Sequence, residues 1–232
     1  MKPYCTAVIV VAGNSTRMGG VPKQFLPLLG KPALFYTLTA FAQTVCIDAI
    51  VLVGKPEHKE RLFACAEQAG MKKSLYFAVG GNSRQQSVLS GVSAAPEQTQ
   101  YVAIHDGARP LITPALISQA VTFAAEYGAA ALSVSVKDTV KVVDSRGFVS
   151  ATPERSALRA VQTPQVFLRT SYLEAAQAAL QSRQEYTDDC ALLEAAGKSV
   201  YLCTGSYENI KLTTPEDCLL AEILLQRREG LS

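Results

Sequence analysis

Along the first 136 residues, short apolar runs alternate with stretches whose apolar residues recur at helical spacing. Uninterrupted apolar runs bounded by turn residues are typical of buried strands, whereas a spacing of three or four residues predicts a helix with one packed face. The strands predicted in this way are residues 7–12, 49–53, 75–79, 101–104 and 130–136. The helices predicted between them are residues 32–42, 57–68, 83–94 and 114–127.

This regular alternation of strand and helix indicates an α/β protein with a Rossmann-like, doubly wound and mostly parallel sheet. Sheets of this kind bind their ligands at the carboxyl ends of the strands. The segments that follow each predicted strand are therefore the first places to look for chemistry.

The alternation breaks after residue 136. Two short β-like runs, residues 139–143 and 148–151, flank the turn-forming sequence DSRG, and together they predict a hairpin. We expect it to project as an arm at about residues 137–158 of a single domain that spans residues 1–232. The elements expected after the arm are a strand at 160–167, helices at 171–181 and 188–196, a strand at 200–203, and a last helix that starts at Thr214-Pro215.

Composition narrows the class of protein without deciding it. The chain has 232 residues, 48% hydrophobic and 18% charged, with a net charge of +2, which fits a globular fold and is too mild for a nucleic-acid binder. Six cysteines without a CxxC pair, and only two histidines, disfavour a zinc site. No leader pattern and no apolar stretch of roughly 20 residues is found, so we expect a cytoplasmic protein that does not span a membrane.

The loop after the first strand carries the strongest signal. Residues 13–25 read GNSTRMGGVPKQF, so glycine-rich backbone is followed by the cations Arg17 and Lys23. Backbone amides and fixed positive charge are what a polyphosphate needs. The loop lacks the Gly-Lys-Ser/Thr of a P-loop, and Ser15 and Met18 stand where a GxGxxG motif needs glycine. It therefore indicates an enzyme that handles a nucleoside triphosphate in another way.

Two further motifs follow predicted strands. Residues 80–88 read GGNSRQQSV, in which the backbone amides and the Ser87 hydroxyl suit the edge of a pyrimidine; a plain strand-to-helix turn capped by Ser83 is the alternative. Residues 105–110 read HDGARP. Asp106 suits ribose hydroxyls or a nearby divalent cation, although an Asp–Arg pair closing the loop would also explain it. We expect His105 to be a hydrogen-bonded neighbour rather than a catalytic base.

These three motifs, in this order, resemble those of the cytidylyltransferases that act on 2-C-methyl-D-erythritol 4-phosphate in isoprenoid synthesis. The resemblance spans nearly the whole chain. Family members often have a second glycine in place of Ser15 and aspartate in place of Asn82. Serine is small and also common at the first position, and the second change should matter little if residue 82 contacts the base through its backbone. The resemblance implies transfer of CMP from CTP to 2-C-methyl-D-erythritol 4-phosphate, which yields 4-diphosphocytidyl-2-C-methyl-D-erythritol and pyrophosphate.

The resemblance also implies a division of roles among residues. The catalytic cations would be Arg17 and Lys23. The residues that bind CTP would be Ala12, Gly13, Gly81, Asn82, Ser87, Asp106 and Gly107. The acceptor phosphate would be positioned by Thr139, Arg155 and Lys211. Supporting contacts would come from Arg109, Thr163 and Thr187.

The family's projecting hairpin mediates dimerisation, so the resemblance implies a homodimer in which the arm offers its Thr and Arg to the partner's active site. Mg²⁺, or another divalent cation, would bind mainly through the CTP phosphates. The acceptor is already a phosphate nucleophile, so the reaction requires positioning and charge neutralisation rather than a general base. A ribitol-5-phosphate cytidylyltransferase and a non-catalytic nucleotide-binding protein remain as alternatives.

Overall fold

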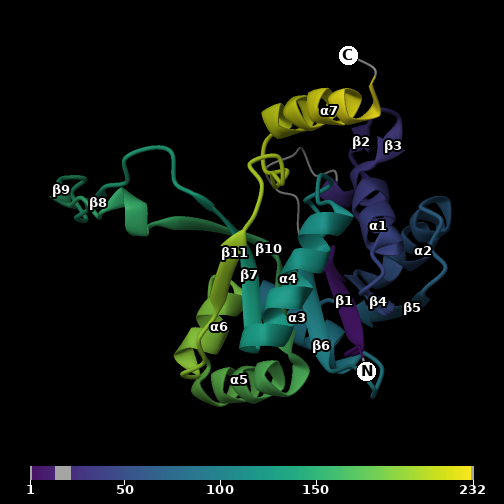
Figure 1. The fold of residues 1–232 in the computed structure, drawn as a ribbon, viewed down its shortest axis with the longest axis horizontal. Helices are drawn as coiled ribbons and strands as arrows, with labels where there is room; N and C mark the ends of the chain where they lie inside the picture. The colour runs from purple at the N-terminus through teal and green to yellow at the C-terminus, as the bar shows by residue number, and fades with distance from the viewer. Residues whose placement is uncertain (1, 14–21, 231–232) are drawn as a thin grey trace.

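The computed structural model describes residues 2–13 and 22–230, so Arg17 lies outside the described residues. The core is a seven-stranded sheet in the order β11-β7-β10-β6-β1-β4-β5 (Figure 1). Every neighbouring pair is parallel except those made by β10, which runs antiparallel to both β6 and β7. The strands are β1 (Cys5–Val10), β4 (Ala49–Gly54), β5 (Ser74–Val79), β6 (Tyr101–Asp106), β7 (Ala129–Ser135), β10 (Arg159–Leu168) and β11 (Tyr201–Thr204).

Helices cover both faces of the sheet, which confirms the predicted doubly wound α/β architecture (Figure 1). The α-helices are α1 (Ala33–Gln43), α2 (Lys59–Gln68), α3 (Arg84–Ser93), α4 (Pro114–Tyr127), α5 (Arg169–Ser182), α6 (Asp189–Ala195) and α7 (Pro215–Glu229). Short 3₁₀ turns are η2 (Lys23–Phe25), η3 (Pro56–His58) and η4 (Arg155–Ala157). None of these described helices has the length and hydropathy needed to cross a bilayer.

The side chains of each central strand alternate between two hydrophobic cores. Ile9 of β1 packs into the core that includes Leu38 of α1, on the face covered by α1, α2 and α4. Its neighbour Val8 packs into the core that includes Val88 and Tyr172, on the face covered by α3, α5 and α6. Because both faces are buried, the strand sequences are apolar throughout rather than alternating, which is why they were visible as runs.

Most predicted boundaries lie within two residues of the observed ones, and the larger differences have local causes. The predicted helix 57–68 is divided into η3 and α2, since Pro56 starts a separate 3₁₀ turn. A small ribbon of β2 (Pro27–Leu28) and β3 (Lys31–Pro32) was not predicted, because two-residue strands carry no periodicity. Leu28 of this ribbon belongs to a third core with Leu225 of α7, which fastens the last helix to the N-terminal half.

The predicted hairpin is confirmed as an arm that extends away from the rest of the chain (Figure 1). Its paired strands, β8 (Val142–Val143) and β9 (Val149–Ala151), are shorter than predicted because the arm has no core of its own to stabilise longer pairing. The turn is held by Asp144, whose Oδ1 accepts hydrogen bonds from the backbone N–H groups of Arg146 and Phe148. Gly147 adopts a φ of 88°, a left-handed conformation that favours glycine.

Gly91 provides a test of how tightly α3 packs on the sheet. A Cβ at this position would lie 2.5 Å from Cγ2 of Val53 and 2.5 Å from Cγ1 of Val8. A glycine-to-alanine change inside a helix normally stabilises it by up to about 1 kcal/mol. Here we expect Gly91→Ala to lower the free energy of unfolding by about 1–3 kcal/mol, because the methyl group overpacks the core. Chemical denaturation measures the change, with the exposed Ser93→Ala on the same helix as the control. A stabilised Gly91→Ala protein would contradict this packing.

Candidate active site

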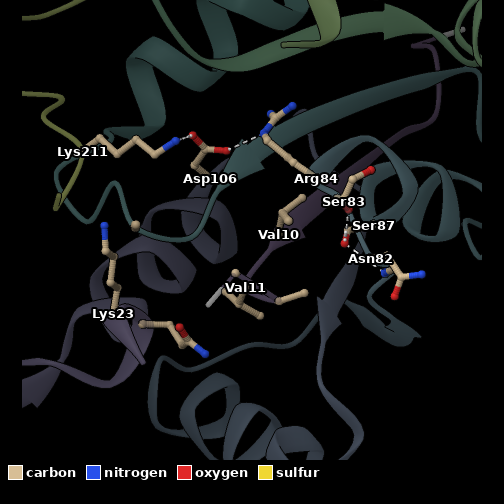
Figure 2. A pocket seen from close by; sticks show the side chains of 14 residues that line it. Val10, Val11, Lys23, Asn82, Ser83, Arg84, Ser87, Asp106 and Lys211 are labelled. Atoms are coloured by element: carbon tan, nitrogen blue, oxygen red, sulfur yellow. Dashed lines mark hydrogen bonds and ion pairs between the residues drawn. The ribbon is translucent and has the colours of Figure 1, made fainter. Parts of the chain in front are cut away.

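A cavity of about 350 Å³ opens at the carboxyl ends of the central strands, where the fold predicts a ligand (Figure 2). Its walls are the segment after β1, the turn that starts α3, the end of β6 and the loop that carries Lys211. Lys23 and Lys211 lie across the cavity from Asn82 and Ser87 (Figure 2). The cavity therefore has a cationic side and a side made of small polar residues.

The floor of this cavity is shaped by two close approaches of backbone. A Cβ at Gly80 would lie 2.3 Å from Cβ of Ala12, and a Cβ at Gly107 would lie 2.3 Å from Cγ1 of Val11. The turns after β5 and β6 can therefore reach the end of β1 only because both positions are glycine. Of the residues predicted to bind CTP, Ala12 and Gly13 line the cavity, whereas Gly107 does not and its neighbour Ala108 lines the wall.

The turn before α3 is held in one shape by its own side chains. The Ser83 side chain accepts a hydrogen bond from the N–H of Gln86 and caps the helix, as predicted. The Gly81 N–H donates to Ser87 Oγ over 3.0 Å, and the Asn82 N–H donates to Gln86 Oε1 over 3.1 Å. Both amides are therefore engaged in hydrogen bonds within the turn itself. They rigidify the wall that faces the cavity, and Gly81, Asn82 and Ser87 all line it.

Asp106, at the end of β6, is the electrostatic centre of the site. Its Oδ2 lies 2.7 Å from Lys211 Nζ and 4.0 Å from Arg109 Nε, and its Oδ1 accepts a hydrogen bond of 3.3 Å from Arg84 Nε. Burial alone would raise the pKa of this carboxyl. The cations, with Arg84 and Lys211 contributing most, more than offset burial and hold its pKa well below the usual range. Asp106 is therefore a fixed negative charge inside a cationic cluster.

His105 faces the interior and not the cavity. It is fully buried, with Nδ1 3.0 Å from Thr163 Oγ1 and Nε2 3.4 Å from the carbonyl oxygen of Arg109. Burial lowers the pKa of His105 to about 3, so the ring is neutral at physiological pH. The prediction that it is a hydrogen-bonded neighbour is confirmed, because both ring nitrogens have partners.

A second cavity of about 140 Å³ adjoins the first. The two share a wall made of Arg84, Asp106 and Lys211. The supporting residues predicted from the sequence all line this second space: Arg109, Thr163 and Thr187. The site thus consists of two compartments separated by one ion-paired cluster, an arrangement that can hold two substrates side by side.

A model of the family described as 2-C-methyl-D-erythritol 4-phosphate cytidylyltransferase matches residues 5–227 of the chain. The chain belongs to this family. An enzyme of that name from Desulforamulus reducens is 47% identical, and the match covers 96% of each chain. Another from Caldanaerobacter subterraneus is 44% identical over 96% of this chain and 99% of its own.

Solved structures of the family share the fold. The 4-diphosphocytidyl-2C-methyl-D-erythritol synthase of Anaerococcus prevotii superposes with a TM-score of 0.88 at 29% identity, over 97% of this chain and 96% of its own. The predicted family, fold class and cytidylyltransferase activity are therefore confirmed. The family match favours methylerythritol phosphate over the alternative ribitol acceptor and favours an enzyme over a non-catalytic binder.

The structure does not bring all the predicted residues of this cytidylyltransferase together. Thr139 and Arg155 are exposed on the arm and line neither cavity. The Arg155 Nη1 atom donates instead to the backbone oxygen of Lys137, at the base of the arm. Their roles in this site stay predictions.

Sequence reasoning missed the roles of two residues that build the site. Arg84 appeared in a quoted motif without a role, yet it lines both cavities. Asn209 is fully buried, where its Nδ2 donates to the Thr163 oxygen and its backbone oxygen accepts from Arg109 Nη1. The available signal for Arg84 was its place in the sequence GGNSR, where a cation follows the helix cap Ser83 at the end of a glycine-containing turn. Asn209 stands two residues before Lys211, but nothing local indicated its own role, because its partners Thr163 and Arg109 lie far away in sequence.

The low pKa of His105 predicts that the free energy of unfolding decreases in acid. Between about pH 6.5 and pH 3 the unfolded chain binds a proton here that the folded chain does not, so stability falls as pH falls, by up to about 1.4 kcal/mol per pH unit. Between pH 6 and 4.5 we expect the unfolding free energy of His105→Gln to depend less steeply on pH than that of the wild type. The difference in slope should correspond to the uptake of up to about one proton fewer on unfolding. Urea denaturation at several pH values measures the slope. Equal slopes for both proteins would show that His105 is not held neutral.

Proposed function

We propose that this protein, acting as a single nucleotidyltransferase domain with an inserted arm, transfers CMP from CTP to 2-C-methyl-D-erythritol 4-phosphate. The observation that carries the proposal is the pair of adjoining cavities that share the Asp106 cluster as a wall. The larger cavity takes CTP, with the base against Asn82 and the ribose at Asp106. The smaller cavity, lined by Thr163 and Thr187, takes the polyol phosphate.

The reaction needs no proton acceptor. An oxygen of the acceptor phosphate attacks the α-phosphorus of CTP, a new phosphoanhydride bond forms, and the bond to the β-phosphate breaks with its electron pair leaving on pyrophosphate. The one histidine near the cavities, His105, is buried with both ring nitrogens engaged, which agrees with a direct transfer. The protein has to align two anions and to neutralise them.

Both cavities are lined by cations that can align and neutralise the two anionic substrates. Lys23 and Arg17 face the triphosphate in this scheme, and Lys211 receives the acceptor phosphate. Lys211 lines both cavities and its side chain is 42% exposed, so a phosphate can reach its ammonium group. A well-placed charge of this kind contributes about 3–4 kcal/mol to transition-state stabilisation.

Mg²⁺ fits the site as a companion of CTP. No group of three or more His, Cys, Asp or Glu side chains within residues 2–13 and 22–230 is arranged to hold a metal ion. Of the described residues that line the larger cavity, Asp106 alone carries a carboxylate, and its neighbours are cations. We therefore propose that the ion is held mainly by triphosphate oxygens, whose charge it neutralises. The protein's contribution there is the positioning of the phosphates.

We further propose a cytoplasmic homodimer joined through the arm. Val143, Phe148 and Val149 are each more than half exposed on a hairpin with no core of its own, so they offer an apolar surface to a second chain. Thr139 and Arg155 lie outside this chain's own cavities, which agrees with their donation to a partner. The six cysteines, all unpaired, suit a reducing compartment.

The activity is tested by measuring pyrophosphate release with CTP, ATP, GTP and UTP against a panel of polyol phosphates. We expect turnover with CTP and 2-C-methyl-D-erythritol 4-phosphate, and little with the other triphosphates. Turnover with ribitol 5-phosphate but not with methylerythritol phosphate would replace the proposed acceptor. Tight CTP binding without pyrophosphate release in any combination would identify a non-catalytic binder.

The arm is tested by Arg155→Ala. If this guanidinium grips the acceptor phosphate, the KM for the acceptor should rise by at least about tenfold, the loss of one charged contact, while the KM for CTP changes little. Arg146→Ala is the matched control, because Arg146 is exposed on the same arm and pairs with its neighbour Asp144. Equal rises in both KM values would exclude an acceptor role.

The same variant tests whether the arm acts on the partner. Arg17→Ala and Arg155→Ala subunits should each be weakly active at low acceptor concentration. Mixing them should restore part of the activity if one site in each mixed dimer receives both intact cations. No recovery in mixtures that have exchanged subunits would show that Arg155 acts within its own chain.

A further inference from the structure

Arg84 ties together three elements that meet at the wall between the cavities. It is the first residue of α3 and follows the turn that faces the base side of the larger cavity. Its Nε donates to Asp106 Oδ1 over 3.3 Å, and its Nη1 lies 2.7 Å from Asp189 Oδ2. One guanidinium therefore bridges a carboxylate at the end of β6 and a carboxylate at the start of α6 (Figure 2 shows the Asp106 side).

The Asp189 end of this bridge is a rigid anchor. Asp189 is 1% exposed, its N–H donates to Gln165 Oε1 over 3.1 Å, and its Oδ1 accepts from the Tyr172 hydroxyl over 3.4 Å. Gln165 in turn donates from Nε2 to Asp188, the residue that caps α6. The anchor thus belongs to the buried junction of β10, α5 and α6, and Asp189 itself lines neither cavity.

The three cations around Asp106 are held differently. Lys211 reaches it from a loop, with a side chain that is 42% exposed, and Arg109 Nε lies at 4.0 Å. Arg84 makes the closer guanidinium contact and is fixed at its other end by a buried partner. The contact of Arg84 with Asp106 therefore does not depend on the position of the Lys211 side chain.

We propose that Arg84 is a positioning residue that orients the Asp106 carboxylate toward the ribose hydroxyls of CTP. The inference rests on the proposed role of Asp106. In this role Arg84 fixes the position of Asp106, which contacts the ribose, relative to the turn that faces the base. Arg84 can do so because it extends from that turn. A lysine cannot replace it, because a single ammonium group does not present the two-directional fork that spans Asp106 and Asp189.

The experiment compares CTP with 2′-deoxy-CTP and 3′-deoxy-CTP as substrates of the wild-type enzyme and of Arg84→Met, Arg84→Lys and Asp189→Asn. In the wild type, kcat/KM should fall about 10- to 100-fold for the analogue that lacks the contacted hydroxyl, the value of a hydrogen bond to a charged group. The quantity compared is the ratio of kcat/KM for CTP to kcat/KM for that deoxy analogue. In the Arg84 variants this ratio should shrink to within about threefold, because activity with CTP falls while activity with the deoxy analogue falls little. Asp189→Asn should reduce this discrimination only partly, since asparagine loses the charge of the anchor but keeps an oxygen that can accept a hydrogen bond from Arg84.

Gln85→Ala is the matched control. Gln85 is the next residue of α3 and also reaches across to residues 184 and 186, but the structure shows no contact between it and Asp106. Its ratio of CTP to deoxy-CTP activity should equal that of the wild type. Thermal melting of every variant identifies any that fail to fold, and Arg84→Lys keeps the charge if Arg84→Met does not fold.

The outcomes separate the possible roles. A ratio that stays at the wild-type value in both Arg84 variants, with equal losses on CTP and deoxy-CTP, would overturn the proposal and leave Arg84 with a structural role. Wild-type enzyme that turns over CTP and both deoxy analogues equally well would overturn the ribose role of Asp106, and the proposal with it. Cytidylyl transfer to methylerythritol phosphate would still stand in that case, because CTP turnover measures it separately.

Discussion

Asp106 carries its charge at the end of the central strand β6 although the residue is only 8% exposed. Moving a carboxylate out of water costs several kcal/mol unless opposite charges and hydrogen bonds replace its hydration. Here the replacement comes from Arg84 and Arg109, which lie within 22 residues of Asp106 in the sequence, and from Lys211, which lies more than a hundred residues away. The chain must therefore bring its middle and last thirds together before this carboxylate can be buried as an ion. Folding and assembly of the site are one event.

The antiparallel strand β10 completes that assembly. It enters the sheet beside β6, and its register with β7 shifts between Val161 and Gln165. At this irregularity Thr163 Oγ1 accepts the N–H of Asp106 and meets His105 Nδ1, so the wall of the smaller cavity is joined to the strand that carries the charge. The second compartment thus depends on the one reversal in the sheet.

The sequence allowed prediction of features whose cause is local. Strands β1 and β4 were visible because burial on both faces makes them apolar throughout, and Ser83 and Thr214 were recognisable as helix caps from their neighbours. The direction of β10 was not predictable, since an apolar run is the same in either orientation. The contact between Arg84 and Asp189 was equally hidden, because it joins residues more than a hundred positions apart and neither has a local partner pattern. The sequence motifs were enough to predict which residues line the cavity, but only the three-dimensional structure showed which of them form ion pairs with one another.

The proposed role of Lys211 explains why three cations, and not one, surround the Asp106 carboxylate. Under the proposed roles, Lys211 has to leave Asp106, at least in part, when the acceptor phosphate arrives, because one ammonium group then has two anions to neutralise. If Lys211 were the sole partner, its departure would leave a buried charge uncompensated, at a cost of about 3–5 kcal/mol. Arg84 and Arg109 remain beside Asp106, so the buried carboxylate keeps two cationic neighbours while the substrate is held. A cluster with spare positive charge lets one cation serve the substrate without destabilising the fold.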